Sequence, residues 1–212
     1  WEGGVEIPSY EKGQIKTSGK TEIVRLEDKT SATIQIGQIT GLKNSDKDYL
    51  PLTIANQVFG GGSFTARLMS IIRDEEGLTY GIYASLSNDV YTDGLWSIWG
   101  TFSPDLLSKG YSSTMRELKR WVAEGVSEEE FNNVKTRLIG SYKVRLATTN
   151  GMASTILSFI QRGYDLDYID NYPKEIEAVS LEDVNAAVKK YIDPEKVVVV
   201  VAGTVTEEDL KK

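Results

Sequence analysis

The sequence predicts an α+β fold, with a mainly antiparallel sheet and helices packed on one face of it. The predicted elements do not alternate: two strands and two helices come first, then two strands, a run of helices and a final strand. Both strand pairs are joined by short polar turns, as in antiparallel hairpins. The last strand, residues 197–202, is continuously apolar, which is typical of a strand inside a sheet. Elements that come in separate runs favour α+β over an alternating architecture.

The composition is that of an ordinary acidic protein. The chain has 212 residues, enough for one domain with a complete core. Its charged fraction is 26% and its net charge is −7, which argues against a general nucleic-acid binder. No apolar run reaches the ~18 residues of a membrane span. We expect a soluble protein, and the bacterial cytoplasm and periplasm both fit. The chain starts at Trp1, not Met, so we expect a fragment or processed piece.

The absence of two residue types limits the metal sites and disulfides that this chain could form. The sequence has no Cys and no His. Disulfides and thiolate metal sites are therefore excluded, and zinc hydrolases nearly always bind their metal through His. We expect no metal site and no cofactor in this chain.

The first part of the chain divides into an arm and the start of a domain. Residues 1–20 mix Gly, Pro, Lys, Glu and Ser without a period, which predicts a linker or N-terminal arm. Residues 21–212 are predicted to form a single domain. It opens with strands at 22–26 and 32–39, the second of which alternates apolar and polar residues. A helix then runs to Val58, with Asp46 or Asp48 as its candidate cap.

The stretch from 58 to 80 combines a flexible turn with a short helix. Gly60, Gly61 and Gly62 form the turn, and Ser63 is the candidate N-cap of a helix starting at Phe64. One face of this helix is apolar, comprising Phe64, Leu68, Ile71 and Ile72. At about 100° per residue, Arg73 lies opposite that face and points outward. Gly77 ends the helix as a C′ residue.

Two strands follow, joined by a hairpin at 88–94. Strict alternation along 78–87 places Tyr80 on the apolar face with Ile82 and Ala84, so we expect its ring to pack and its hydroxyl to emerge at the edge. The return strand, 95–102, carries Trp96, Ile98 and Phe102 on one face.

The remaining pattern is helical until the last strand. A helix after Pro104 ends at Gly125, and Ser127 and Glu130 form a capping box for the next helix. A helix at 151–161 is predicted to bury its apolar side chains, namely Met152, Ile156, Phe159 and Ile160. Two more helices follow, at 168–179 and after the cap Ser180.

The stretch Gly-Gly-Gly-Ser-Phe at 60–64, then Arg67-Leu68, Arg73 and Gly77-Leu78-Thr79-Tyr80, resembles the C-terminal half of the M16 zinc metallopeptidases. That family includes pitrilysin, mitochondrial processing peptidases and insulin-degrading enzymes, and the resemblance continues through Thr206. It implies the LuxS/MPP-like metallohydrolase fold. In the family, an Arg and a Tyr with six residues between them reach substrate from the half that does not bind zinc. Arg73 and Tyr80 match that spacing.

The resemblance also implies a function and a partner. It implies that the chain is the substrate-binding, non-metal half of an M16-type zinc peptidase and is inactive alone. Arg73 and Tyr80 would be its catalytic pair, and they would bind peptide together with Gly61, Gly62, Ser63 and Phe64. Zinc is expected in the partner, an N-terminal M16 domain or a catalytic subunit carrying His-x-x-Glu-His.

Simpler interpretations stand beside this one. Some M16 members are assembly subunits without activity, so a scaffold is the alternative function. The glycine turn lacks the Lys-Ser or Lys-Thr of a Walker phosphate loop. Taken alone, Arg73 is a surface cation beside the acidic residues 74–76, and Tyr80 is a strand aromatic. If a partner half docks, an exposed apolar patch should mark the place, with Trp96 and Trp99 as candidates.

Overall fold

The computed structural model describes residues 4, 19–62, 64–87 and 89–210. Within these residues, five strands form one sheet in the order β1-β5-β2-β4-β3. Only β1 and β5 pair in parallel; the other neighbours are antiparallel. The strands are β1 (Lys20–Arg25), β2 (Ala32–Ile39), β3 (Thr79–Ser87), β4 (Leu95–Phe102) and β5 (Val198–Gly203). The α+β prediction is confirmed, and the last strand is internal as predicted.

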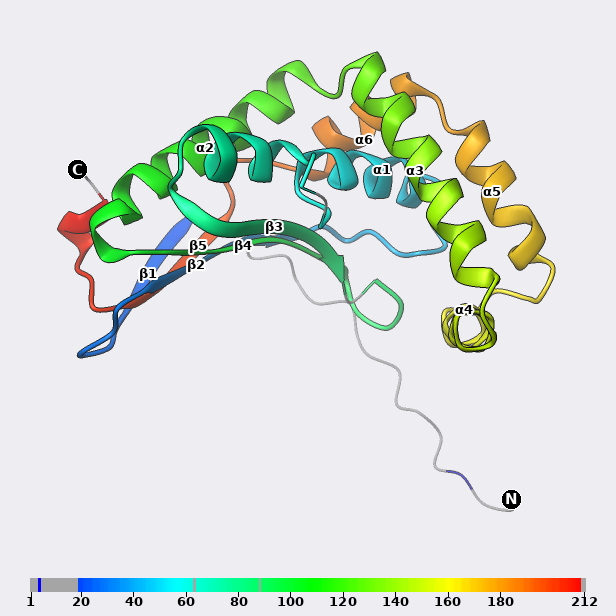
Figure 1. Cartoon of the computed structure of the whole chain (residues 1–212), viewed down its shortest axis with the longest axis horizontal. Helices are drawn as coiled ribbons and strands as arrows, with labels where there is room; N and C mark the ends of the chain where they lie inside the picture. Colours follow the sequence, from blue (N-terminus) through cyan, green and yellow to red (C-terminus); the bar gives the residue numbers. More distant parts are fainter. Residues whose placement is uncertain (1–3, 5–18, 63, 88, 211–212) are drawn as a thin grey trace.

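In the described part of the chain, the helices lie on one side of this sheet and none covers the other side, which we call the open face (Figure 1). The arm predicted at 1–20 lies almost entirely outside the described residues, so the boundary at 21 remains a prediction. The α-helices are α1 (Tyr49–Phe59), α2 (Leu107–Glu124), α3 (Glu128–Leu146), α4 (Thr149–Gln161), α5 (Tyr168–Ala178) and α6 (Leu181–Tyr191). Shorter turns are the π-helix η1 (Met69–Glu75) and the 3₁₀-helices η2 (Pro104–Leu106) and η3 (Glu207–Leu210).

The core lies between the sheet and the helices, around an aromatic cluster. The rings of Phe59 and Trp121 stack with their centroids 4.4 Å apart, and Trp96 packs beside them. Trp96 is fully buried, and its indole N–H donates to Asn56 Oδ1 at 3.0 Å. Proposing Trp96 as part of an exposed patch was therefore wrong, because its strand position faces the helices.

The helix caps and helix ends predicted from a few neighbouring residues are mostly confirmed by the structure. The predicted capping box of Ser127 and Glu130 opens α3, and Ser180 with Asp183 does the same for α6. Gly125 ends α2 with a φ of 77°. Asp48 precedes α1 but makes no side-chain capping bond.

Helix α4 differs from its prediction. Its buried residues are Gly151 and Thr155, whereas Met152 is 36% exposed and Ile160 is 56% exposed. The reason is its position: α4 packs on α3 and α5 at the end of the molecule, away from the sheet (Figure 1). The face that meets those neighbours carries Gly151, Thr155 and Phe159, whereas Met152 and Ile160 lie outside it.

Candidate functional site

Arg73 is carried by a π-helix, not by the α-helix that the sequence predicts. Helix η1 begins at Met69, several residues after Phe64, and the Glu76 N–H donates to the Ile71 carbonyl oxygen, five residues back, at 2.9 Å. Gly77 follows with a φ of 64°, as predicted for the terminating glycine. The Arg73 side chain is 30% exposed. π-Helical turns are rare in proteins, and those that do occur are often found at functional sites.

Tyr80 is turned outward by a β-bulge at the start of β3. Between Thr79 and Ile82 the register with β4 shifts, so that Tyr80 and Gly81 together oppose the single residue Thr101. A bulge of this kind reverses which side chains face the core. Tyr80 is consequently 90% exposed, and placing it on the apolar face with Ile82 was wrong.

Contacts from both sides hold the bulge in place. The Thr79 hydroxyl accepts a bond from the Gly81 N–H at 3.2 Å and donates to the Thr101 carbonyl oxygen. The Ile82 N–H, freed from the ladder, donates to Met69 Sδ at 3.4 Å. This last contact ties η1 to β3 directly. A glycine inside a strand pattern is a known sign of a bulge, and Gly81 was the signal that could have predicted this one.

These two irregular segments bring Arg73, Tyr80 and Phe64 together. The guanidinium carbon of Arg73 lies 5.1 Å from the Phe64 ring centre and 5.6 Å from the Tyr80 ring centre. Both distances are within the range of a cation–π contact. Arg73 Nη1 also donates to Asp74 Oδ1 at 2.5 Å. Among the described residues, that is the only hydrogen bond of its guanidinium, and none engages the Tyr80 hydroxyl.

The glycine turn contacts strand β3, although not all its residues are described. The Gly60 carbonyl accepts the Ala84 N–H at 2.8 Å, so the end of α1 covers part of the free edge of β3. Gly62 adopts a φ of 84°, which suits glycine. Gly61 is partly buried against Gln57. Ser63, predicted as a cap and a binding residue, lies outside the described residues.

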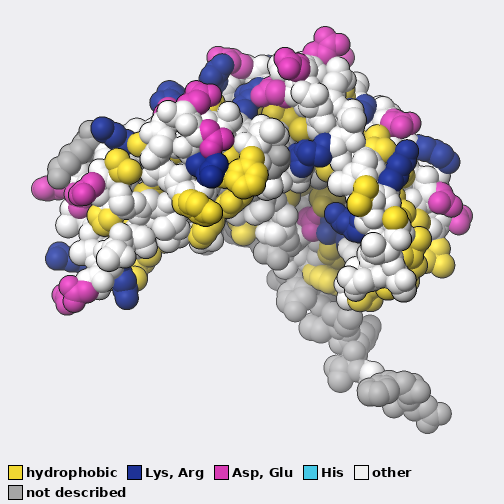
Figure 2. Space-filling model, in the orientation of Figure 1, with side chains coloured by type: hydrophobic (Ala, Val, Ile, Leu, Met, Phe, Trp, Pro, Cys, Tyr) yellow, Lys and Arg dark blue, Asp and Glu magenta, His cyan; other side chains and the backbone are white. Residues whose placement is uncertain are grey.

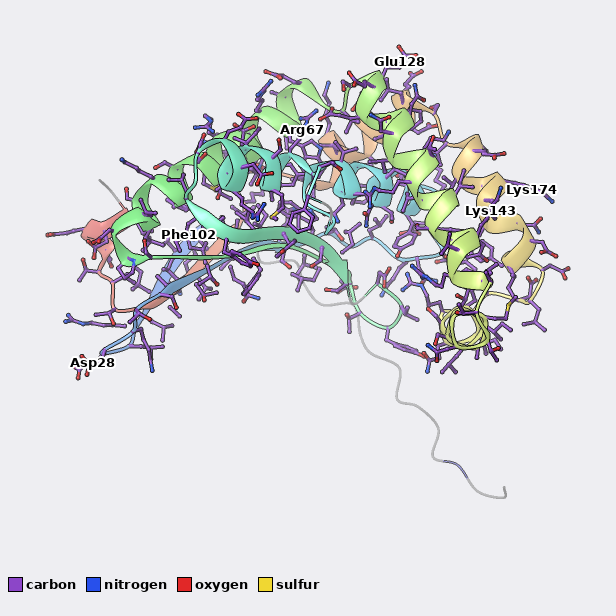
Figure 3. All side chains as sticks on the ribbon, in the orientation of Figure 1. Asp28, Arg67, Phe102, Glu128, Lys143 and Lys174 are labelled. Carbon is purple, nitrogen blue, oxygen red and sulfur yellow. The ribbon has the colours of Figure 1, made fainter. Side chains whose placement is uncertain are left out.

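A further ion pair fixes the residues just before η1 to the helix layer. Arg67 binds both carboxylate oxygens of Glu130, at 2.5 Å each, and donates to the Gly125 carbonyl oxygen at 2.8 Å. Glu130 is at the same time the capping residue of α3, and Arg67 lies in the helix layer (Figure 3). Burial opposes ionisation of Glu130, but the bonds from Arg67 and Ser127 hold its pKa below the ordinary value. No local pattern predicts this pair, because Arg67 and Glu130 are 63 residues apart in the sequence.

The open face of the sheet continues the site with exposed aromatic rings. Tyr83 and Trp99 are cross-strand neighbours whose rings stack, with centroids 6.3 Å apart. Trp99 is 44% exposed, so it remains a candidate for the docking patch. Figure 2 shows hydrophobic side chains gathered over β3 and η1, beside charged ones.

The described part of the chain contains neither a group of metal-ligating residues nor a helix that could span a membrane. No three of its His, Cys, Asp or Glu residues come together as a possible metal site. Every described helix is too short or too polar to span a membrane.

Known proteins are similar to this chain in sequence and in fold. Residues 1–138 match the peptidase M16 inactive domain. The chain is 26% identical over 186 residues to the "Non-peptidase homolog YmxG" of Helicobacter pylori (strain ATCC 700392 / 26695), covering 87% of this chain and 43% of the relative. It is 29% identical over 198 residues to the "Uncharacterized zinc protease YmxG" of Bacillus subtilis (strain 168), covering 90% and 46%. The chain thus spans a little under half the length of these curated relatives.

The crystal structure of a peptidase M16 inactive domain from Pseudomonas fluorescens superposes with a TM-score of 0.85 at 22% sequence identity. The match covers 96% of this chain and 48% of that one. At this identity the likeness concerns the fold. The family match, in contrast, covers well over half of the sequence. The chain therefore belongs to the peptidase M16 family and is its inactive, C-terminal-type domain.

Proposed function

We propose that this M16 inactive domain binds peptide substrate for a zinc-bearing partner, and that Arg73 and Tyr80 stabilise the transition state of peptide hydrolysis. The observation that carries the proposal is the placement of the Arg73 guanidinium against the exposed Tyr80 ring. Each residue comes from an irregular segment, and the two irregularities together place a cation and a phenol at one point of the surface.

The chemistry suits these two side chains. Peptide hydrolysis builds negative charge on the carbonyl oxygen, and donors aimed at that oxygen lower the barrier. A guanidinium has five N–H donors, of which the described contacts use one, and a phenol supplies one more. Both can also hold a peptide backbone in register before the reaction. The Phe64 ring also lies within cation–π distance of the guanidinium, with its centre 5.1 Å from the guanidinium carbon.

This chain does not fit a zinc site of its own. It lacks His and Cys entirely, and its described carboxylates do not cluster. Metal, general base and attacking water would have to come from a partner carrying His-x-x-Glu-His. The open sheet face with Tyr83 and Trp99 is the surface on which we place that partner.

A second function has one specific observation in its favour. The Helicobacter pylori relative is named a non-peptidase homolog. By that analogy the chain would be a scaffold, in which Arg73 and Tyr80 are surface residues only. The two functions differ in whether the complex with a partner cleaves peptides.

Reconstitution of the chain with a zinc-bearing partner distinguishes the peptidase function from the scaffold function. The chain and a partner carrying His-x-x-Glu-His are assayed alone and together on a mixture of quenched peptides. The peptidase proposal expects cleavage only with both present, and zinc only with the partner. A stable complex that cleaves nothing would support the scaffold.

A further inference from the structure

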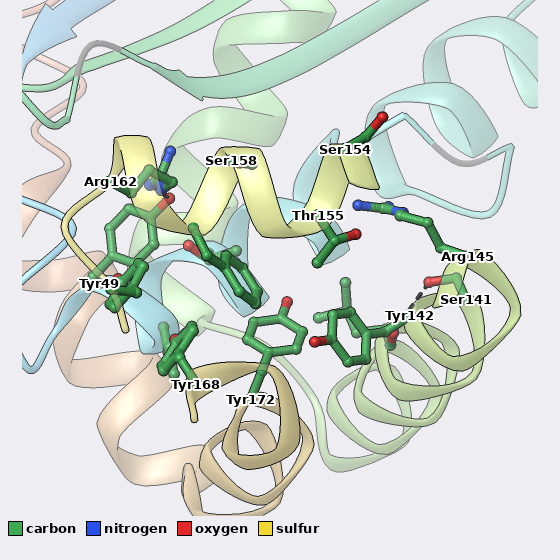
Figure 4. Close-up of a pocket in the computed structure, with 15 residues that line it drawn as sticks. Tyr49, Ser141, Tyr142, Arg145, Ser154, Thr155, Ser158, Arg162, Tyr168 and Tyr172 are labelled. Atoms are coloured by element: carbon green, nitrogen blue, oxygen red, sulfur yellow. Dashed lines mark hydrogen bonds between the residues drawn. The ribbon is translucent and has the colours of Figure 1, made fainter. Parts of the chain in front are cut away.

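A cavity of about 320 Å³ lies among α1, α3, α4 and α5, on elements that carry neither Arg73 nor Tyr80 (Figure 4). Aromatic rings form much of its wall. Tyr142 and Tyr172 lie with their centroids 4.8 Å apart, and Phe159 meets Tyr168 edge-on at 4.9 Å. Ligand sites have volumes of about 300–1,000 Å³, so this cavity has room for a molecule with a single ring.

Two buried hydroxyls in the cavity wall, those of Thr53 and Thr155, have no hydrogen-bond partner among the described residues. Thr155, on α4, is only 4% exposed, and its hydroxyl is buried without a hydrogen bond to any described residue. Buried hydroxyls are normally bonded, so an unbonded one is a reason to look for a ligand. Figure 4 shows Thr155, Tyr172 and Arg145 turned toward the same space from three different helices.

The charge in the cavity is positive, although the chain as a whole is acidic. Two arginines line it and no Asp or Glu does. Arg162 is neutralised, because its Nη2 lies 2.5 Å from Asp89 Oδ2. Arg145, on α3, has no ion pair with any described carboxylate. Its charge is therefore available to a ligand at the cavity mouth.

We propose that this cavity binds an aromatic carboxylate. The ring would lie among Tyr142, Phe159 and Tyr172, while the carboxylate meets the guanidinium of Arg145, which can bind both its oxygens. A polar substituent on the ligand would bond the Thr155 hydroxyl. The same chemistry is presented by a free aromatic acid and by the C-terminal aromatic residue of a peptide.

Calorimetric titration of the full chain tests the proposal with four probes. They are N-acetyl-tyrosine, its amide, and a tripeptide ending in Tyr with a free or an amidated C-terminus. We expect saturable binding of at least one free acid and binding weaker by about 10-fold or more for its amide. If only the tripeptide acid binds, the source is a peptide terminus; if N-acetyl-tyrosine binds as well, a free acid is sufficient.

Three variants assign the contacts. Arg145→Gln should weaken binding about 10-fold or more, and Thr155→Val about 3–10-fold, without lowering the melting temperature. Lys143→Gln is the matched control, because Lys143 is an exposed cation on the same helix that does not line the cavity (Figure 3). The proposal is overturned if no free acid binds saturably, or if Lys143→Gln weakens binding as much as Arg145→Gln.

Discussion

The guanidinium carbon of Arg73 lies 5.6 Å from the centre of the Tyr80 ring, although one residue belongs to a π-helix and the other to a strand. The contact depends on two departures from regular structure, the π-turn and the bulge between Thr79 and Ile82. Both departures leave the core intact, because Met69 and Ile72 remain buried beneath them. The pair can therefore be changed without opening the core.

Arg73→Ala and Tyr80→Phe should each change the free energy of unfolding by no more than about 0.5 kcal/mol. Tyr80 is 90% exposed, and the Arg73 ion pair is with its exposed neighbour Asp74. Urea unfolding of the isolated chain measures the change. A loss above about 1 kcal/mol in either variant would mean that the residue supports the fold, and activity data could not then be assigned to chemistry.

Gly60→Ala should destabilise the chain by about 1–3 kcal/mol. A Cβ at this position would lie 2.6 Å from the Ala84 backbone nitrogen and 2.8 Å from Leu68 Cδ1. Gly140, on α3, is the matched control, since a Cβ there meets nothing within 4 Å. Gly140→Ala should stabilise by about 0.5–1 kcal/mol, because alanine favours helix. Thermal melts of the two variants should move in opposite directions, and a neutral Gly60→Ala would contradict the packing described here.

Arg67→Met and Glu130→Gln should each cost about 1–3 kcal/mol of unfolding free energy. The two side chains form a paired contact while 17% and 30% exposed, so each loss leaves a half-buried partner without its bond. The double variant should lose less than the sum of the single losses, since both remove the same interaction. Strictly additive losses in a double-mutant cycle would show that the pair does not couple.

The free energy of unfolding should fall as the pH is lowered, and part of this fall should come from protonation of Glu130. Its pKa is lowered in the folded chain, so its carboxylate stabilises the fold fully above its ordinary pKa of 4.5. That contribution is lost as the pH falls below 4.5 and through the folded pKa. Glu130→Gln should show a shallower decline of unfolding free energy over this range. Equal pH slopes in the variant and the wild type would rule out the contribution.

Much of the fold follows from local signals in the sequence. The strand at 32–39 has the bounds predicted from its alternation, and Ser127 caps α3 because its partner Glu130 is three residues away. Gly77 and Gly125 end their helices for the same local reason. Such features need no knowledge of distant parts of the chain.

The geometry of the candidate site could not be predicted from local sequence patterns, because it depends on contacts between residues far apart in the chain. The bulge at Gly81 reverses the face of Tyr80, and it is held by Thr101 across the sheet and by Met69 from η1. Helix α4 exposes Met152 because the sheet ends before reaching it, a fact about the architecture and not about the helix. The Arg–Tyr spacing drew attention to Arg73 and Tyr80, and the structure shows that these two side chains lie together. Their role in substrate binding stays a prediction.

The most direct test of the central claim is kcat/KM of the reconstituted complex on a quenched peptide, measured for wild type, Arg73→Ala, Tyr80→Phe and the double variant. Loss of one donor to a developing oxyanion costs about 10²–10³ in rate. We predict a fall of this order for each single variant, with unchanged melting temperature and zinc content, and a double loss smaller than the product because the residues act together. Values within about twofold of wild type for both single variants would contradict the claim and leave Arg73 as a surface charge beside an acidic run.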